Sequence, residues 1–173
     1  MKGIIFLDID GVLNCQLHYQ SEQFKKYVAN SKSDKVDWDK YYLSQLSIER
    51  VQWLNELCEE MDLSIVISST WRIGKAIEEL QRILNLAGAT FEIIGKTEID
   101  RNQFRGNEIY KWIELHSVKL FNQKPHIFRK YVILDDDSDM LYWQKNNLFI
   151  VDSYAGLTPN ICYQIKNFFK GFE

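Results

Sequence analysis

Two carboxylates, Asp8 and Asp10, follow a short apolar run near the start of the chain, in the string IIFLDIDG. On an extended segment, positions i and i+2 point to the same side, so both carboxylates converge where a strand ends. Like charges this close are costly unless a cation lies between them or one is protonated. Gly11 permits the sharp exit that exposes them. A simple Asp-Gly turn explains Asp10 but not Asp8, where an apolar residue would cost less.

A second acidic cluster follows the apolar run 131–134 and comprises Asp135, Asp136, Asp137 and Asp139. Four acids in five residues at the end of a strand are a candidate site for a hard divalent cation. Acidic enrichment at a helix N-terminus is the alternative. That alternative accounts for Asp137 and Asp139 but explains Asp135 poorly.

Hydroxyl and basic side chains complete the candidate chemistry. The string SSTWR spans residues 68–72 and directly follows the apolar run 63–67. Small hydroxyls at a strand end can bind phosphate together with backbone N–H groups, although helix capping is their commoner use. Arg105 opens a later helix, where a cation is unfavourable for the helix dipole unless something anionic lies nearby. A solvated surface arginine is the alternative.

These residues need a scaffold, and the apolar pattern predicts one. Apolar runs that are rich in β-branched and aromatic residues span residues 4–7, 63–67, 91–94, 131–134 and 148–151. Runs without alternation suit strands that are buried on both faces, as in a parallel sheet. Helical periods lie between the runs, over residues 48–61, 77–87, 109–116 and 160–170. Ser138 is a candidate cap for a further short helix through Trp143.

This alternation predicts an open, doubly wound α/β domain with a mostly parallel sheet of about five strands. Ligands of such sheets bind beyond the carboxyl ends of the strands, where the polar residues described above lie. We expect residues 1–173 to form a single domain.

One long segment, residues 15–46, interrupts the alternation and contains no clear strand or long amphipathic helix. We expect it to be a small flap or insert after the first strand, because long loops in compact domains are usually functional lids or disordered. Its aromatic residues could stack on nucleic-acid bases. A small hydrophobic subdomain that covers the edge of the sheet explains them about as well. These aromatic residues are Tyr19, Phe24, Tyr27, Trp38, Tyr41 and Tyr42.

Composition excludes several classes of protein. The net charge of −3 argues against a protein that coats nucleic acid through its phosphates, although not against an enzyme that acts on one strand end. Three scattered cysteines do not form a disulfide framework, and a reducing, cytoplasmic setting is the simpler interpretation. The three histidines lack the spacing of zinc ligands. We expect no signal peptide and no membrane contact, since no apolar run approaches the ~20 residues that cross a bilayer.

Taken in order, these motifs resemble those of the haloacid dehalogenase-like (HAD) phosphohydrolases over nearly the whole chain. The combination of DIDGVLN, ISSTWR, RGNEI, VILDDDSDM and a late GLT is most similar to the small HAD domains of RNA-repair proteins. Those domains are relatives of polynucleotide 3′-phosphatases. The resemblance also implies that a large cap domain is absent, because only about ten residues separate Ile94 from Arg105.

The resemblance implies a role for each matching residue. Asp8 would be the nucleophile that forms an aspartyl-phosphate, and Asp10 the general acid and then the general base. Mg²⁺ would be held by Asp8, the backbone carbonyl of Asp10, and Asp135, with Asp136 as a supporting acid. The position of the metal ligand within residues 135–137 is open.

The resemblance also implies a phosphate site and a substrate class. Ser68 or its neighbour Ser69 would bind phosphate oxygens, and Arg105 would neutralise phosphate and nucleophile. Trp71 and Arg72 are candidate substrate contacts, although a core tryptophan is the competing interpretation. The expected activity is that of a Mg²⁺-dependent phosphomonoesterase acting on a nucleic-acid end, such as an RNA or DNA 3′-phosphate, or on a nucleotide. A small-molecule nucleotidase or sugar phosphatase and a non-catalytic binding domain are the alternatives.

Overall fold

The computed structural model describes residues 3–30, 36–100 and 103–172, and it has a five-stranded, wholly parallel sheet at its centre. The strands are β1 (Gly3–Leu7), β2 (Leu63–Ile67), β3 (Ile93–Lys96), β4 (Tyr131–Asp135) and β5 (Leu148–Ile150). Their order across the sheet is β3-β2-β1-β4-β5. The strand order reverses direction beside β1, so the carboxyl ends of β1 and β4 flank the switch point where doubly wound sheets bind ligands. The predicted fold class is confirmed.

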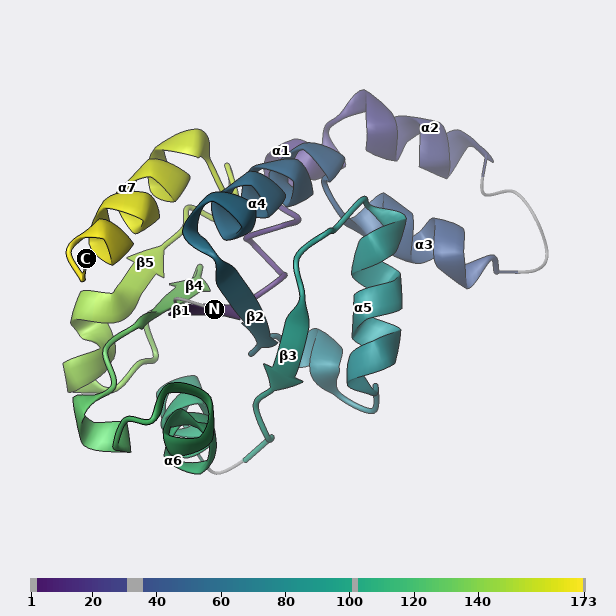
Figure 1. Ribbon diagram of the computed structural model, residues 1–173. Coiled ribbons are helices and arrows are strands. Elements are labelled where there is room, and N and C mark those ends of the chain that lie inside the picture. The colour runs from purple at the N-terminus through teal and green to yellow at the C-terminus, as the bar shows by residue number, and fades with distance from the viewer. Residues whose placement is uncertain (1–2, 31–35, 101–102, 173) are drawn as a thin grey trace.

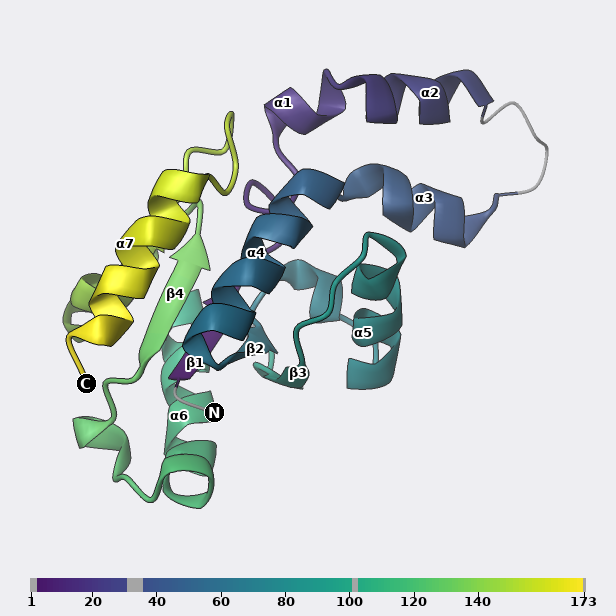
Figure 2. The ribbon, with the colours of Figure 1, turned by 45° about the horizontal axis from the view of Figure 1, so that its top comes forward.

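Helices cover both faces of this sheet (Figures 1 and 2). The helices α4 (Ile48–Met61), α5 (Ile77–Leu86) and α7 (Pro159–Lys170) pack on one face, and α6 (Arg105–Phe121) packs on the other. Side chains of β1 alternate between the two cores, because successive residues of a strand point to opposite faces. Ile5 and Leu7 join the core beneath α4, whereas Ile4 and Phe6 join the core beneath α6.

Local signals in the sequence explain where these helices begin and end. The Ser47 side chain accepts a hydrogen bond from the Arg50 N–H and caps α4. Thr158 caps α7 in the same way, and Pro159 occupies the first turn, where its missing N–H costs nothing. Asn122 ends α6 in the left-handed conformation, with φ of 52°.

The parallel register aligns the residues that follow the strands. Leu7 pairs with Ile67 of β2 on one side and with Leu134 of β4 on the other. Ile67 pairs in turn with Lys96 of β3. The next residue of each strand therefore falls on one row at the carboxyl edge of the sheet; from β4 to β3 this row is Asp135, Asp8, Ser68 and Thr97.

Two elements differ from the sequence-based expectation. The expected strand at 91–94 lies at Ile93–Lys96 instead, and its pairing with β2 is irregular between Ile65 and Val66. The expected helix from Ser138 to Trp143 is also wrong, because the chain forms a 3-10 helix, η3 (Tyr142–Asn147), several residues later. The Gln144 side chain holds its first turn by accepting from the Leu141 N–H and donating to the Gly106 carbonyl. Further 3-10 helices are η1 (Thr70–Arg72) and η2 (Pro125–Ile127).

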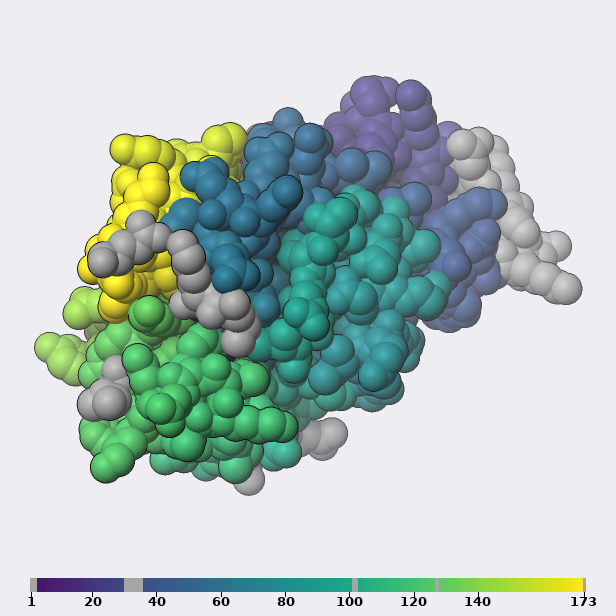
Figure 3. All heavy atoms as spheres, viewed as in Figure 1, coloured from purple at the N-terminus to yellow at the C-terminus, as the bar shows by residue number. Residues whose placement is uncertain are grey.

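The segment after β1 is helical, but its helices are short, as expected of residues 15–46, which contain no long amphipathic period. It contains α1 (Gln16–Tyr19), α2 (Glu22–Asn30) and α3 (Trp38–Gln45), which we call the insert. Asp37 caps α3 by accepting from the Lys40 N–H, and the His18 ring donates to the Ser44 carbonyl at 2.6 Å. In Figure 3 the atoms of the insert form one end of the molecule, beside those of α5.

Among the described residues, no helix combines the length and the apolar character that crossing a membrane requires.

Candidate active site

A buried charge network lies at the switch point of the sheet. The Arg105 Nη1 atom lies 2.9 Å from Asp8 Oδ2 and 2.8 Å from Asp135 Oδ2. Asp8 and Asp135 are 5% and 0% exposed, so neither carboxylate has bulk water to stabilise its charge. These carboxylates are the anionic neighbours that offset the position of Arg105 at the N-terminus of α6.

The same region contains a group of acids that fits a metal ion. One carboxylate oxygen from each of Asp8, Asp135 and Asp136 lies within 4.8 Å of the others. Burial, together with the charge of Asp8, raises the pKa of Asp135 to about 7 and also raises the pKa of Asp136. A hard cation among these oxygens would relieve that repulsion, and carboxylates are the ligands that Mg²⁺ prefers. The Asp10 carboxylate is not part of this group.

Gly11 makes room for the third acid. Its φ is +72°, a left-handed conformation that favours glycine, and a Cβ atom on it would collide with the Asp136 carboxylate. The glycine of the DIDG string therefore lets the acid after β4 approach the loop after β1. This close approach brings the two acidic motifs together.

The Asp10 carboxylate is exposed but held in place from two sides. Its Oδ1 atom accepts hydrogen bonds from Asn14 Nδ2 at 2.8 Å and from Trp71 Nε1 at 3.1 Å. Asn14 is itself fixed, because its Oδ1 atom accepts from the Gly11 N–H at 2.9 Å. Both bonds to Asp10 end on one oxygen, so the other is available to a substrate or a water molecule.

The hydroxyls that follow β2 and β3 have different surroundings. Ser69 Oγ accepts from the Trp71 N–H at 3.4 Å and caps η1. Ser68 Oγ and Thr97 Oγ1 are buried and have no hydrogen-bond partner among the described residues. Leaving a buried donor unpaired costs about 1–3 kcal/mol, so an anion that accepted from it would recover this free energy.

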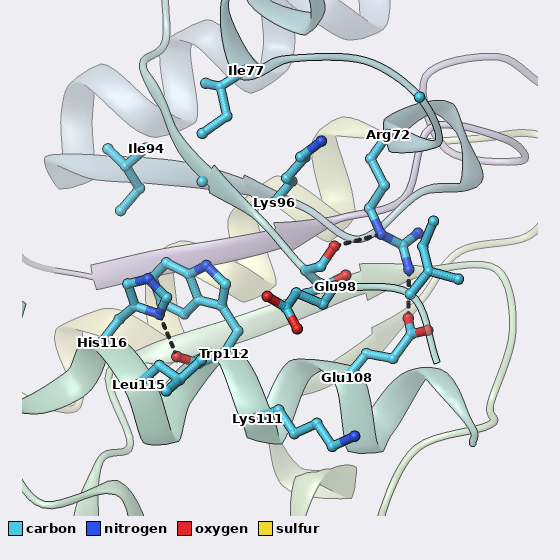
Figure 4. A pocket seen from close by; sticks show the side chains of 14 residues that line it. Arg72, Ile77, Ile94, Lys96, Glu98, Glu108, Lys111, Trp112, Leu115 and His116 are labelled. Carbon is cyan, nitrogen blue, oxygen red and sulfur yellow. Dashed lines mark hydrogen bonds and ion pairs between the residues drawn. The ribbon is translucent and has the colours of Figure 1, made fainter. Parts of the chain in front are cut away.

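Arg72 lies in the interior, where its donors bind protein atoms. Its Nη2 atom lies 2.5 Å from Glu108 Oε2, and its Nε donates to the Thr97 carbonyl at 2.9 Å (Figure 4). Its Nη1 donates to the carbonyls of Ser68 and Ser69. Only 5% of Arg72 is exposed, so this arrangement fixes the loop after β2 instead of presenting the guanidinium to solvent. Arg72 thus differs from Trp71, which contacts Asp10 directly.

A pocket of about 570 Å³ lies beside Arg72, between β3 and α6 (Figure 4). Its lining includes Lys96, Glu98, Lys111 and the stacked rings of Trp112 and His116. The Arg72–Glu108 ion pair forms one end of this pocket, and Thr97 is shared between the pocket and the row of strand ends.

The structure brings most of the predicted site residues together. Asp8, Asp135, Asp136 and Arg105 form one cluster, Asp10 lies on the loop that follows Asp8, and Ser68 is the next residue along the row. Sequence analysis missed Thr97, Asn14 and Glu108. Thr97 directly follows a strand, so the rule that selected Ser68 would have found it if β3 had been placed correctly. No sequence signal links Asn14 or Glu108 to its partner.

An open parallel sheet whose first strand leads into an Asp-x-Asp loop and whose fourth ends in an acidic pair defines a HAD-like domain. A family model described as the HAD domain in Swiss Army Knife RNA repair proteins matches residues 4–161. Because this match covers most of the chain, the chain belongs to that family. No curated protein and no solved structure matches it. The family supports a HAD-type hydrolase function in general.

Proposed function

We propose that this protein is a Mg²⁺-dependent phosphomonoesterase that acts on nucleic-acid ends through an aspartyl-phosphate on Asp8. The observation that carries the proposal is the bridge that Arg105 makes between Asp8 and Asp135 at the carboxyl edge of the sheet. A cation between two buried carboxylates marks the place where a phosphate can approach a carboxylate nucleophile without prohibitive repulsion.

The first step uses the two carboxylates of the DIDG loop. A carboxylate oxygen of Asp8 attacks phosphorus, and the bond from phosphorus to the leaving oxygen breaks. Asp10 donates its proton to that oxygen, as the bonds from Asn14 and Trp71 hold its carboxyl group in place. In the second step water attacks phosphorus, Asp10 accepts the water proton, and Asp8 is released with inorganic phosphate.

Other residues would stabilise the charge that the reaction creates. Arg105 would donate to the phosphate oxygens, and the unpaired hydroxyl of Ser68 would donate to another. Ser69 is the weaker candidate for this role because its hydroxyl caps η1. Asp8, Asp135 and Asp136, with the backbone carbonyl of Asp10, would hold Mg²⁺, which supplies charge neutralisation at the phosphate when bound.

The substrate class rests on the family and on the open surroundings of Asp10. The matched family is described as a HAD domain in RNA repair proteins, and this description favours a nucleic-acid end as the substrate. The described residues between β3 and α6 form only a short connection, and the insert is the longest addition to the sheet. A site without a large cover can admit the end of a polymer, which a closed small-molecule pocket would exclude.

A test for the covalent intermediate separates catalysis from mere binding. We expect wild-type protein with Mg²⁺ to release phosphate from p-nitrophenyl phosphate and from phosphorylated oligonucleotides. With substrate labelled in the phosphate, the Asp10→Asn variant should give a burst of p-nitrophenol and accumulate acid-stable, phosphate-labelled protein. The first step proceeds because an aryl leaving group needs little acid assistance, whereas hydrolysis of the aspartyl-phosphate needs the base. A protein that releases no phosphate from any monoester would overturn the proposal and support a binding domain.

A further inference from the structure

Four aromatic side chains contact one another in a chain that starts beside Asp10 and runs onto the insert. Ring centroids are 5.9 Å apart for Trp71 and Tyr42, 5.8 Å for Tyr42 and Tyr41, and 5.8 Å for Tyr41 and Trp38. Trp71 lies in η1, whereas the other three rings belong to α3. We call these four residues the aromatic track.

The exposure of these rings argues against a purely structural role. Trp38 is 60% exposed and Tyr41 is 39% exposed, although large aromatic rings gain most free energy when they are buried. A subdomain that served only to cover the sheet would turn these rings inward. Tyr42 and Trp71 do pack against the core, which anchors the track at its inner end.

The chemistry at Asp10 places the leaving group beside this track. A general acid must lie within hydrogen-bond reach of the oxygen that it protonates, so the leaving group lies next to the Asp10 carboxyl group. Trp71 Nε1 donates to that carboxyl group from 3.1 Å. The part of the substrate that follows the scissile phosphate is therefore directed toward Trp71 and the rings beyond it.

The chemistry of the track favours a strand of planar groups. The exposed rings, Trp38 and Tyr41, can each stack on a base, and stacking is tolerant of sequence because every base has a π-face. Charge contributes less: the Lys75 ammonium lies over the Tyr42 ring at 5.7 Å, whereas Lys40 is paired with Asp37 at 3.2 Å. With a net charge of −3 on the chain, attraction of phosphates alone would hold a strand poorly.

We infer that the aromatic track binds the terminal nucleotides of a single-stranded nucleic acid whose end phosphate is in the active site. This inference rests on the proposed phosphatase activity and adds to it the strand state and the binding surface. Trp71 would contact the terminal nucleoside and Trp38 a nucleotide further from the end. The activity would therefore increase with the length of the strand over the first few nucleotides.

The test compares substrates of increasing length with matched variants. The substrates are p-nitrophenyl phosphate, a mononucleotide, and single-stranded dinucleotides and tetranucleotides of RNA and DNA, with the phosphate at either end. For wild-type protein we expect kcat/KM to rise from mononucleotide to tetranucleotide. In Trp38→Ala the ratio of kcat/KM for the tetranucleotide to that for p-nitrophenyl phosphate should fall about tenfold, the value of one stacked base. Trp38→Phe should restore most of it.

Trp143→Ala is the matched control. Trp143 is 59% exposed, almost the same as Trp38, but it packs against Tyr110 beside the pocket near Tyr131, where β4 begins. We expect it to keep the wild-type length dependence. Tyr41→Ala provides a second track variant, and thermal unfolding of every variant shows whether it is folded.

A binding measurement keeps this inference separate from the activity. In the Asp8→Asn background, a single-stranded oligonucleotide should quench tryptophan fluorescence, and Trp38→Ala should weaken its affinity about tenfold. If Asp8→Asn binds the oligonucleotide in this way but the wild-type protein releases no phosphate from any substrate, the inference about the aromatic track stands and the proposed phosphatase activity is overturned. Three results would overturn the inference about the aromatic track. The first is equal kcat/KM for mononucleotide and tetranucleotide, and the second is a preference for a duplex end or a phosphopeptide. The third is wild-type length dependence in Trp38→Ala.

Discussion

The row of strand ends and the insert both take part in the site that we propose, but they are held in place by different contacts. Asp8 follows β1 and Asp135 ends β4, and the register of these two buried strands fixes their separation. The insert consists of short helices joined by side-chain contacts, such as the one from His18 to Ser44, and it leaves Trp38 largely exposed. Rigid strands suit the chemistry, which needs exact distances, whereas an exposed ring such as Trp38 can adjust to a substrate.

A variant of the proposed nucleophile tests the difference between the two regions most directly. Asp8→Asn should abolish phosphate release from every substrate, because a neutral amide cannot form the acyl-phosphate. By contrast, variants of the insert should change the preference among substrates. Phosphate release, assayed with Mg²⁺ and a large excess of protein, is the measurement.

Thermal unfolding provides the control for this variant. Asp8→Asn should remain folded, because it removes one charge from a cluster of like charges while Asp135 stays paired with Arg105. Turnover near the wild-type level in a folded Asp8→Asn protein would show that the nucleophile lies elsewhere.

The acids that we propose as Mg²⁺ ligands should respond to Mg²⁺ in a way that the acids of the insert do not. EDTA should eliminate activity, and Mg²⁺ should restore it. Mg²⁺ at 100 times its Kd stabilises a folded protein by about 2.7 kcal/mol through linkage, so the wild-type Tm should rise. Asp135→Ala should lose most of that rise, whereas Glu22→Gln, a change to an exposed acid of α2, should retain it. Equal stabilisation of Asp135→Ala and wild type would move the metal site toward Asp136.

The contrast between the strand ends and the insert also explains which site residues the sequence could predict. The sequence alone could identify Asp8 and Asp135 as site residues. A continuous apolar run predicts a buried parallel strand, and a charge at its end has few structural reasons to be there. The sequence could not identify Thr97 in this way, because the irregular pairing of β3 with β2 moves the strand end beyond the apolar run. Polar residues directly after an apolar run thus mark the strand ends, except where a local irregularity of the register displaces the strand, as it does before Thr97.

The insert was harder to predict for a different reason. Its helices α1, α2 and α3 are short, and isolated helices below about 12–15 residues are marginal without tertiary contacts. Those contacts join residues far apart in the sequence, such as His18 with Ser44 and Tyr42 with Trp71. The partner of Arg72 was hidden in the same way, since Glu108 lies on another helix. Composition showed many aromatic residues but not which of them would form a surface.

Two ion pairs test whether the interior and the insert differ in energetic terms. Arg72 and Glu108 are 5% and 8% exposed, whereas Arg82 and Asp39 in the pair that joins α5 to the insert are 51% and 55% exposed. Glu108→Gln should lower the free energy of unfolding by about 3–5 kcal/mol, because it leaves a buried guanidinium without its counter-charge.

Asp39→Asn is the comparison for that prediction, and it should change the free energy of unfolding little, since water and salt screen an exposed pair. Urea unfolding curves of both variants provide the measurement. Similar losses for the two variants would show that Arg72 and Glu108 are better hydrated than their burial indicates.

The smallest effect that we predict concerns the pH dependence of the insert. Burial, with a contribution from the charge of Arg50, lowers the pKa of His18 below its usual value of 6.5. Its Nε2 atom faces the Ser44 carbonyl, which can only accept, so the neutral ring carries its proton there and Nδ1 is the atom that titrates. The unfolded chain binds a proton before the folded one does, so the contribution of His18 to stability is present above pH 6.5 and is lost as pH falls.

His18→Gln isolates this contribution, because an amide can still donate to Ser44 but does not titrate in this range. We expect wild type to lose more stability than His18→Gln between pH 7.5 and about 5.5, measured by urea unfolding. Asp135 has the opposite effect: its pKa is raised to about 7, so acidification favours the folded state through that group. Asp135 titrates in both proteins, so its effect cancels in the difference between them. Parallel pH profiles for the two proteins would mean that His18 is protonated at little cost, and hence that water reaches the joint between α1 and α3.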